Sequence, residues 1–178
     1  PFKWYRPLVL RPAIPNDAAQ IAAIYAPFVD RGVVSFESIA PDTTEMAQRI
    51  ERTLETHPWL VAENESGDIT GYAYATRFRD RAAYRFAAET SVYIRPTEHR
   101  RGLGTELSLA LLDALRAARF RIAVAVITLP NDPSVRMHER IGYQPAGRLP
   151  AIGWKFDRWH DIGYWSLDLG GEDPRPPA

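Results

Sequence analysis

The stretch His99-Arg100-Arg101-Gly102-Leu103-Gly104-Thr105 lies between a run with the pattern of a β-strand, which ends near Arg95, and a strongly amphipathic helix. Its two glycines allow the backbone to approach a ligand closely, and the free N–H groups at the start of the next helix favour negative charge. The basic side chains of residues 99–101 add to that attraction. The stretch therefore predicts a pyrophosphate pocket, although a strand-to-helix turn can also need a glycine for purely conformational reasons.

The spacing of the glycines excludes two familiar phosphate-binding loops. A Walker loop needs Lys followed by Ser or Thr after its second glycine, and a dinucleotide fingerprint needs a third glycine three residues after its second. Leu107 stands where that third glycine would be, and no Lys follows Gly104.

The remaining pattern resembles the signature of the Gcn5-related N-acetyltransferase (GNAT) family, which is Gln or Arg, two residues, Gly, one residue, then Gly or Ala. His99 departs from the first position. In the family the backbone amides of this loop hold the pyrophosphate of acetyl-coenzyme A, and a backbone contact tolerates that change. The resemblance implies acetyl-coenzyme A as co-substrate, bound by His99, Arg100, Arg101, Gly102, Leu103, Gly104 and Thr105.

The length and composition of the chain indicate a single domain. The 178 residues, 46% of them hydrophobic, suffice for one domain with a sizeable core, which we place at residues 1–170 with a flexible, proline-rich tail at 171–178. Lys plus Arg equals Asp plus Glu at 22 each, so no global field attracts nucleic acid or an anionic membrane. Neither a membrane-length apolar run nor a signal-peptide pattern is found, which predicts a cytoplasmic protein.

The chain contains no cysteine, which excludes disulfides, a thiol nucleophile and cysteine-based metal sites. Only four histidines are present, and no two of them have the i, i+4 spacing of a helical metal motif. We therefore expect no metal.

Hydrophobic periodicity predicts alternating strands and helices. Strands are expected at Leu8–Leu10, Trp59–Ala62 and Ile69–Ala75, the last two joined by a turn at Glu65–Asp68. Helices are expected after Asn16-Asp17, which would cap the first, and after Asp42-Thr43-Thr44.

The second half continues with a strand at Thr90–Arg95, a helix over 103–115 and a continuous apolar strand at Ile122–Leu129. A helix from Asp132 or Pro133 to Ile141, stopped by Gly142, and a last strand near Gly163–Leu169 follow. The predicted fold class is α/β (α+β), a single GNAT domain whose central, mostly antiparallel mixed sheet is flanked by helices. This order of elements is also that of the GNAT family, so the resemblance covers nearly the whole chain.

Two further stretches narrow the resemblance. Leu129-Pro130-Asn131-Asp132-Pro133-Ser134-Val135-Arg136-Met137-His138-Glu139-Arg140-Ile141-Gly142-Tyr143 and Trp159-His160-Asp161-Ile162-Gly163-Tyr164-Trp165 closely resemble the phosphinothricin N-acetyltransferase branch of the family. That branch includes acetylases of methionine sulfone and methionine sulfoximine. The resemblance implies acetylation of the α-amine of a small amino-acid analogue.

An α-ammonium group must lose a proton before its nitrogen can attack a thioester, which requires a base. Glu89 opens the strand that leads to the glycine loop, amid small and apolar residues, and burial there would raise its pKa. An exposed strand-end carboxylate is the alternative. In Glu89-Thr90-Ser91-Val92-Tyr93 it matches the glutamate that acts as general base in the resembling enzymes, directly or through water.

His138 lies where many relatives carry a tyrosine that protonates the departing thiolate, and histidine there is the phosphinothricin branch's own variant. An imidazole could assist deprotonation, protonate coenzyme A or orient the substrate. The alternative is a core histidine satisfied by a hydrogen bond. His57 and His160 have no comparable support, and we predict structural roles for both.

The resemblance also assigns the rest of the site. A backbone N–H of Val92-Tyr93-Ile94 would stabilise the oxyanion and the same backbone would pair with the pantetheine arm. Asn131 and Ser134 would meet the rest of the cofactor. The substrate-binding residues of the branch match Phe36, Arg79, Arg81, Tyr84 and Val126.

Two other classes of function remain open. An acetyltransferase acting on polyamines, protein lysines or N-termini would share the cofactor loop but present an open, often acidic groove. The cluster of Arg79, Arg81 and Tyr84 argues against such a groove. A non-catalytic acetyl-coenzyme A sensor would not need both Glu89 and His138. A homodimer is implied by the resemblance alone.

Overall fold

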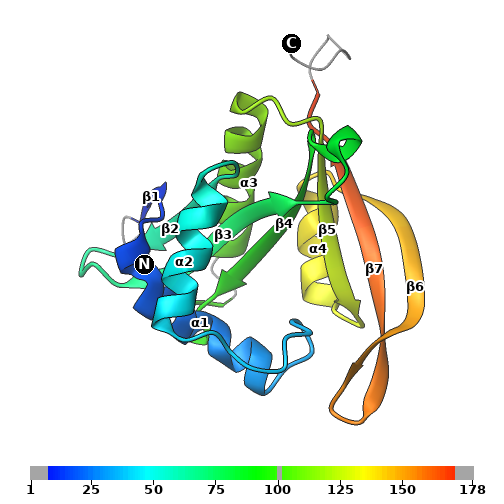
Figure 1. Cartoon of the computed structure of the whole chain (residues 1–178), viewed down its shortest axis with the longest axis horizontal. Helices are drawn as coiled ribbons and strands as arrows, with labels where there is room; N and C mark the ends of the chain where they lie inside the picture. Colours follow the sequence, from blue (N-terminus) through cyan, green and yellow to red (C-terminus); the bar gives the residue numbers. More distant parts are fainter. Residues whose placement is uncertain (1–7, 100–101, 171–178) are drawn as a thin grey trace, which may run out of the picture.

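A seven-stranded sheet forms the middle of the molecule (Figure 1), in the computed structural model that describes residues 8–99 and 102–170. The strand order is β1-β2-β3-β4-β5-β7-β6, and every neighbouring pair is antiparallel except β4 and β5. The strands are β1 (Val9–Pro12), β2 (Trp59–Glu63), β3 (Ile69–Arg77), β4 (Ala87–Ile94), β5 (Ile122–Leu129), β6 (Gln144–Lys155) and β7 (Arg158–Asp168). The expected mixed, mostly antiparallel sheet is confirmed.

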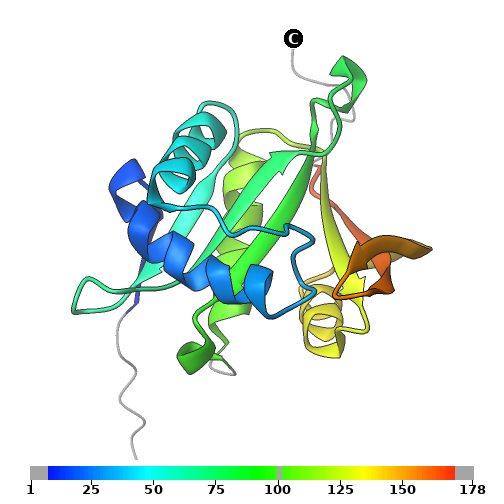
Figure 2. The ribbon, with the colours of Figure 1, turned by 60° about the horizontal axis from the view of Figure 1, so that its bottom comes forward.

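Helices cover both faces of this sheet. The long helices are α1 (Ala18–Asp30), α2 (Thr43–Leu54), α3 (Leu103–Ala117) and α4 (Asp132–Arg140), and the short 3-10 turns are η1 (Pro15–Asp17), η2 (Ala82–Tyr84) and η3 (Pro96–Glu98). Helices α1 and α2 pack on one face, and α3 packs on the other, as the rotated view in Figure 2 makes plain. Two separate apolar cores result, one on each side of the sheet.

Strand β4 contributes to both cores because its side chains alternate between the faces. Ala88 lies in the core under α3, whereas Tyr93 lies in the core under α1 and α2. By the same alternation Thr90 faces the α3 side, and Glu89 faces the side covered by α1 and α2. Two neighbouring residues of one strand thus serve opposite faces of the sheet.

The parallel pair, β4 with β5, is joined over half of its length. Cα partners run from Ala87 and Ile122 to Thr90 and Ala125, and the two strands part beyond that point. On its other side β4 stays paired with β3 as far as Ile94. Beyond Thr90, the backbone N–H and C=O groups of β4 that point toward β5 therefore have no partner on β5 and face the space between the two strands.

Most elements lie where the sequence predicted them, but several of their boundaries differ. The first strand is Val9–Pro12 rather than 8–10, and the last begins at Arg158, because it pairs with β6 along a long hairpin. Glu89 is the third residue of β4 instead of its first, since Ala87 and Ala88 already pair with β5. Helix α4 ends at Arg140, with Ile141 as its C-cap and Gly142 at a φ of 105°.

The expected cap of the first helix is also different. Asp17 does precede α1, but its carboxylate accepts hydrogen bonds from the guanidinium of Arg11 at 2.7 and 2.9 Å and from the Ile14 N–H. An ion pair to β1 therefore replaces the side-chain cap. Asp42, by contrast, caps α2 as predicted and accepts from the Glu45 N–H at 2.8 Å. The tail at 171–178 lies outside the described residues.

A buried lysine ties the β6–β7 hairpin to the segment after α1. Lys155, at the end of β6, is 9% exposed and donates from Nζ to the backbone carbonyls of Val29 (2.6 Å) and Ser35 (2.8 Å). The segment that links α1 to α2 crosses the sheet in front of β4 in Figure 2. Lys155 thus fixes the hairpin beside the segment that carries Phe36.

Replacing Lys155 by methionine is expected to lower the free energy of unfolding by about 2–4 kcal/mol, because two buried carbonyls lose a charged donor while the side chain keeps its length. Chemical denaturation of the variant measures the change. Arg158→Met is the control, since Arg158 is exposed on the same hairpin and its loss should stay within about 0.5 kcal/mol. Equal stability of the two variants would contradict a structural role for Lys155.

Candidate active site

A cleft opens where β4 and β5 part. It is lined on one side by Thr90–Tyr93, on the other by Ala125–Thr128, and it is closed by α4 and by Val34. It brings together six of the residues predicted from the sequence: Val92, Tyr93, Val126, Asn131, Ser134 and His138. Strand separation exposes backbone N–H and C=O groups that a long, extended ligand can pair with.

The closed end of the cleft is held by a hydrogen bond that sequence reasoning missed. The hydroxyl of Tyr143 lies 2.8 Å from Thr90 Oγ1, and Oγ1 also lies 3.2 Å from the Val124 carbonyl, the only acceptor-only group of the three. Thr90 therefore donates to Val124 and accepts from Tyr143. These bonds join β4 to β5 at the last paired residues, so they fix the point at which the strands part.

His138 projects from α4 and is 6% exposed. Its Nδ1 lies 2.8 Å from the Ser134 carbonyl, which can only accept, so Nδ1 carries the hydrogen and Nε2 keeps its lone pair. Burial lowers the pKa of His138 below 6.5, and the Ser134 carbonyl opposes this in part. The ring also meets Tyr143 edge-on, with centroids 5.1 Å apart, which places it near Thr90 on the α3 side of the sheet.

Glu89 lies on the other side of the sheet, one residue before the cleft begins. Burial raises its pKa above the usual 4.5, as expected from the sequence, and the positive charge of Arg79 opposes the rise. Its Cα partner on β3 is Thr76. A half-buried carboxyl beside a cleft, with a pKa raised above that of an exposed glutamate, is a better proton acceptor than an ordinary surface carboxylate.

The glycine loop enters α3 as the sequence predicted. Gly102 is the N-cap at a φ of 83°, a left-handed conformation that favours glycine, and a Cβ there would meet no atom within 4 Å. Leu103, Gly104 and Thr105 form the first turn, whose N–H groups have no partner within the helix. The exposed His99 ring lies 2.9 Å from the Ile94 carbonyl, which ties the loop to β4. Arg100 and Arg101 lie outside the described residues.

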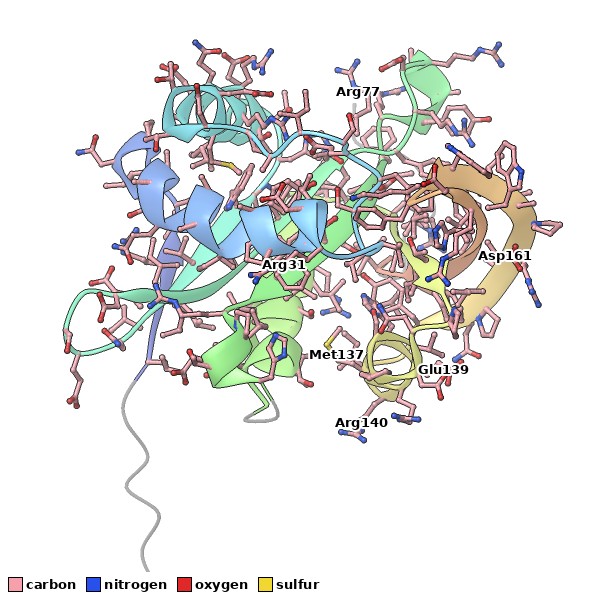
Figure 3. The ribbon with its side chains drawn as sticks, turned by 90° about the horizontal axis from the view of Figure 1, so that it is seen from below. Arg31, Arg77, Met137, Glu139, Arg140 and Asp161 are labelled. Carbon is pink, nitrogen blue, oxygen red and sulfur yellow. The ribbon has the colours of Figure 1, made fainter. Side chains whose placement is uncertain are left out.

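Helix α4 stands beside the start of α3. Asn131 caps α4 and accepts from the Ser134 N–H at 3.3 Å, so its amide nitrogen is left to contact other groups. Met137 lies on the side of α4 that faces α3, whereas Glu139 and Arg140 lie on other sides of that helix (Figure 3). A Cβ on Gly104 would come within 3.3 Å of the Met137 sulfur. Gly104 therefore lets the two helices approach closely.

The predicted substrate-binding residues are not in the cleft, apart from Val126. Arg79, Arg81 and Tyr84 are exposed on the segment between β3 and β4, at the end of the sheet nearest Glu89. Phe36 is 40% exposed and packs against β6, since a Cβ on Gly153 would fall 2.2 Å from its ring. Only Arg79 is linked to the site by a physical observation, through its effect on the pKa of Glu89.

Within residues 8–99 and 102–170, no three histidine, aspartate or glutamate side chains gather where a metal ion could be held. None of the helices in those ranges is both long and apolar enough to pass through a lipid bilayer.

Comparisons with known proteins agree with this geometry. Residues 10–163 match the family model described as acetyltransferase (GNAT) domain. Phosphinothricin N-acetyltransferase of Streptomyces viridochromogenes is 41% identical over 172 residues, which cover 97% of this chain and 92% of the relative. The L-methionine sulfoximine/L-methionine sulfone acetyltransferase of Salmonella typhimurium is 33% identical, over 91% of this chain and 95% of the relative.

Among solved structures, the GNAT superfamily phosphinothricin acetyltransferase from Sinorhizobium meliloti, in complex with acetyl-coenzyme A, superimposes with a TM-score of 0.91. It is 35% identical, and the match covers 96% of this chain and 93% of that structure. The family match spans most of the chain, and both the strand order and the parting of β4 and β5 fall within it. The chain therefore belongs to the GNAT acetyltransferase family.

Proposed function

We propose that the protein transfers the acetyl group of acetyl-coenzyme A to the α-amine of a small amino-acid analogue such as L-phosphinothricin, methionine sulfone or methionine sulfoximine. The observation that carries this proposal is the cleft between β4 and β5. It begins one residue after a half-buried carboxyl of raised pKa, on the strand that is followed in the chain by the glycine-capped helix α3. The names of the two relatives supply the substrate class.

Acetyl-coenzyme A fits this cleft by the chemistry of its parts. The pyrophosphate would accept hydrogen bonds from the N–H groups at the start of α3, aided by the helix dipole. The pantetheine amides would pair with the backbone of Val92, Tyr93 and Ile94, where β4 has lost its β5 partner. Asn131 and Ser134, at the start of α4, would contact the remainder of the cofactor.

Glu89 is proposed as the general base. Its carboxylate takes a proton from the α-ammonium group, directly or through one water, and the nitrogen lone pair then attacks the thioester carbonyl carbon. The resulting oxyanion accepts a hydrogen bond from a backbone N–H of the Val92–Ile94 segment. As the intermediate collapses, the nitrogen loses its second proton, the carbon–sulfur bond breaks, and the amide forms. The released coenzyme A thiolate takes up that second proton, so that the products are the amide and the free thiol.

The acidic groups of the acceptor would be bound by cationic and hydrogen-bonding side chains. Arg79 and Arg81 can bind a carboxylate or phosphinate through their planar guanidinium groups, and Tyr84 can donate a hydrogen bond. Phe36, beside β6, and Val126, in the cleft, would supply apolar contacts to the acceptor. Arg79 already acts electrostatically on Glu89, so an acceptor bound to it would bring its amine near the base.

The proposed function is tested by following coenzyme A release with a thiol reagent, to which a cysteine-free chain adds no background. Acceptors are phosphinothricin, methionine sulfone, methionine sulfoximine, methionine, spermidine and a lysine peptide. Turnover of the first three well above the others is the expected result. Turnover of spermidine or the peptide alone would leave an acetyltransferase with another acceptor, and binding of acetyl-coenzyme A without any turnover would indicate a sensor.

We further propose that the protein forms a homodimer through the β6–β7 hairpin. This hairpin exposes five large apolar side chains, namely Leu149, Ile152, Trp154, Phe156 and Trp159, and β6 is an edge strand of the sheet. Exposed apolar groups gathered on one element commonly mark an interface between proteins.

Light scattering after size exclusion should give twice the 20.1 kDa of one chain. Trp154→Ser combined with Trp159→Ser should shift the mass toward the monomer, because it removes the two most exposed rings of the hairpin. Leu109→Ser serves as the control, since Leu109 is 43% exposed on α3, away from the hairpin. A monomeric mass for the unmodified protein would contradict the proposal.

A further inference from the structure

The cleft between β4 and β5 reaches both faces of the sheet. His138 lines it on the α3 side. Val34 lines it on the other side, from the segment that crosses in front of β4 in Figure 2. Glu89 faces this second side but is not among the lining residues. The proton of an amine that attacks a thioester in the cleft therefore has to pass from the cleft to Glu89.

Ser91 stands between Glu89 and the cleft. It lines the cleft and follows Glu89 by two residues on β4, so both side chains lie on the same face of the sheet. Tyr93, the next residue on this face, packs in the core under α1 and α2, which identifies the face. In an extended strand the Cα atoms of Glu89 and Ser91 are about 7 Å apart. The glutamate side chain, or one bridging water, spans that separation.

The other hydroxyl groups that β4 and β5 bring to the lining are less well placed. Thr90 faces the α3 side and is engaged in the hydrogen bonds at the closed end of the cleft. Tyr93 and Thr128 share the face of Glu89, but each lies four residues beyond the level of Glu89, about 13 Å along its strand. Ser91 is therefore the strand hydroxyl of the cleft that lies nearest to Glu89.

A tyrosine of β3 lies directly opposite Ser91. Tyr74 and Ser91 are Cα partners, as are Thr76 and Glu89, so Tyr74 is the diagonal neighbour of Glu89 on the same face. Burial raises the pKa of Tyr74, a side-chain hydrogen bond with Ser91 opposes the rise, and the negative charge of Glu89 adds to it. The Tyr74 ring stacks on Trp59 with centroids 4.3 Å apart, which fixes the direction of its hydroxyl.

We propose that Ser91 relays the proton of the acceptor's ammonium group from the cleft to Glu89, and that Tyr74 is a positioning residue that orients the Ser91 hydroxyl. This inference rests on the proposed function, because it takes Glu89 as the base. A hydroxyl can accept one hydrogen bond while it donates another, which a relay requires.

The relay step leaves serine unchanged. Ser91 Oγ accepts a proton from the ammonium nitrogen while its own hydroxyl proton passes to the Glu89 carboxylate, directly or through one water. One N–H bond breaks and one carboxyl O–H bond forms. The nitrogen keeps the electron pair of the broken bond, and this lone pair attacks the thioester carbonyl carbon.

Replacing Ser91 by alanine is expected to lower kcat/KM for the acceptor about tenfold or more, because the proton loses its path to the base. Affinity for acetyl-coenzyme A should not change, since the proposed contacts of the pantetheine arm are with the backbone of residues 92–94. Ser91→Thr keeps a hydroxyl and should retain most of the activity. The control is Thr76→Val, because Thr76 is opposite Glu89 but lines a separate cavity of about 350 Å³, between the C-terminal half of α2 and strands β2 and β3.

A double variant separates the relay from a structural effect. If Ser91 acts only through Glu89, Ser91→Ala should slow the Glu89→Gln protein by less than about twofold, although it slows the unmodified protein about tenfold or more. Losses that multiply in the double variant would overturn the proposal, because they would show that the two residues act independently.

The role of Tyr74 is tested by Tyr74→Phe, which keeps the stacked ring and removes the hydroxyl. We expect kcat to fall about three- to tenfold with little change in KM, and the solvent deuterium isotope effect on kcat to rise as proton transfer becomes slower. Tyr72→Phe is the matched control, since Tyr72 lies in the same stack but opposite Tyr93. Equal losses in the two variants would overturn the assignment of Tyr74.

Failure of the relay can be distinguished from failure of the proposed function. All variants are assayed with whichever acceptor is turned over fastest, because the relay step is the same for any amine. If Glu89→Gln loses activity and Ser91→Ala does not, only the relay is wrong. If Glu89→Gln keeps full activity, or if no amine is acetylated, the proposed base or the proposed function fails, and the relay fails with it.

Discussion

Replacing Glu89 by glutamine is expected to lower kcat/KM for the amino-acid acceptor by about 10²–10⁴-fold, the usual contribution of a positioned general base. Glutamine has the same shape but cannot take a proton from the α-ammonium group. Affinity for acetyl-coenzyme A should not change, because Glu89 lies on the face of β4 opposite to Thr90 and outside the lining of the cleft. Steady-state kinetics and equilibrium binding of acetyl-coenzyme A measure the two quantities.

The pH dependence gives an independent test. Only the carboxylate form of Glu89 can act as a base, and burial raises its pKa, so the protein holds that proton at a pH where an exposed glutamate has lost it. As the pH falls through this raised pKa, kcat/KM should therefore fall, at a higher pH than an unperturbed glutamate would dictate. Glu89→Gln should abolish this acidic limb.

The control for this variant is Glu51→Gln, since Glu51 is an exposed glutamate on α2. It should leave kcat/KM and the pH profile as they are. If Glu89→Gln also retained full activity, another group would act as the base, and the Glu89 side chain would contribute only to the packing of β4.

The elements of the fold could be predicted because their patterns are local. Ile122–Leu129 is a continuous apolar run that Pro130 ends, and it forms the strand β5. Asp42 directly precedes an amphipathic stretch and caps α2. The raised pKa of Glu89 followed in the same way from small and apolar neighbours along one strand.

The parts that could not be predicted depend on contacts between distant segments. At the end of the β4–β5 pairing, Thr90 donates to the Val124 carbonyl and accepts from Tyr143, which is 53 residues away in the sequence. Lys155 is buried against carbonyls more than a hundred residues away. Phe156 and Asp157 form the hairpin turn, and both have positive φ. The sequence lacks the Asn-Gly or Asp-Gly pair that predicts such a turn. The cavity between the C-terminal half of α2 and strands β2 and β3 likewise exists only once α2 has packed on the sheet.

The second large effect is expected from substitution of His138, whose position favours a role in the departure of the coenzyme A thiolate. Glu89 and Thr90 face opposite sides of the sheet, and His138 lies on the Thr90 side through its contact with Tyr143. We therefore infer that the amine is deprotonated on one face while the coenzyme A sulfur departs near the other. With Nδ1 bound to the Ser134 carbonyl and a lowered pKa, the imidazole is neutral at pH 7 and offers a lone pair at Nε2.

His138→Gln is expected to reduce kcat about 10²-fold with little change in KM for either substrate. It removes the Nε2 lone pair that can take the second proton from the nitrogen of the tetrahedral intermediate and return it to the departing thiolate. His160→Gln is the matched control, because His160 is equally buried at 6% exposure and is also bound to a carbonyl, that of Lys155 at 2.9 Å. Both variants should melt at a lower temperature than the unmodified protein, but only His138→Gln should lose kcat. If both kept kcat and lost only stability, His138 would be a core histidine, and the thiolate would have to take its proton from water, because the glutamate lies across the sheet.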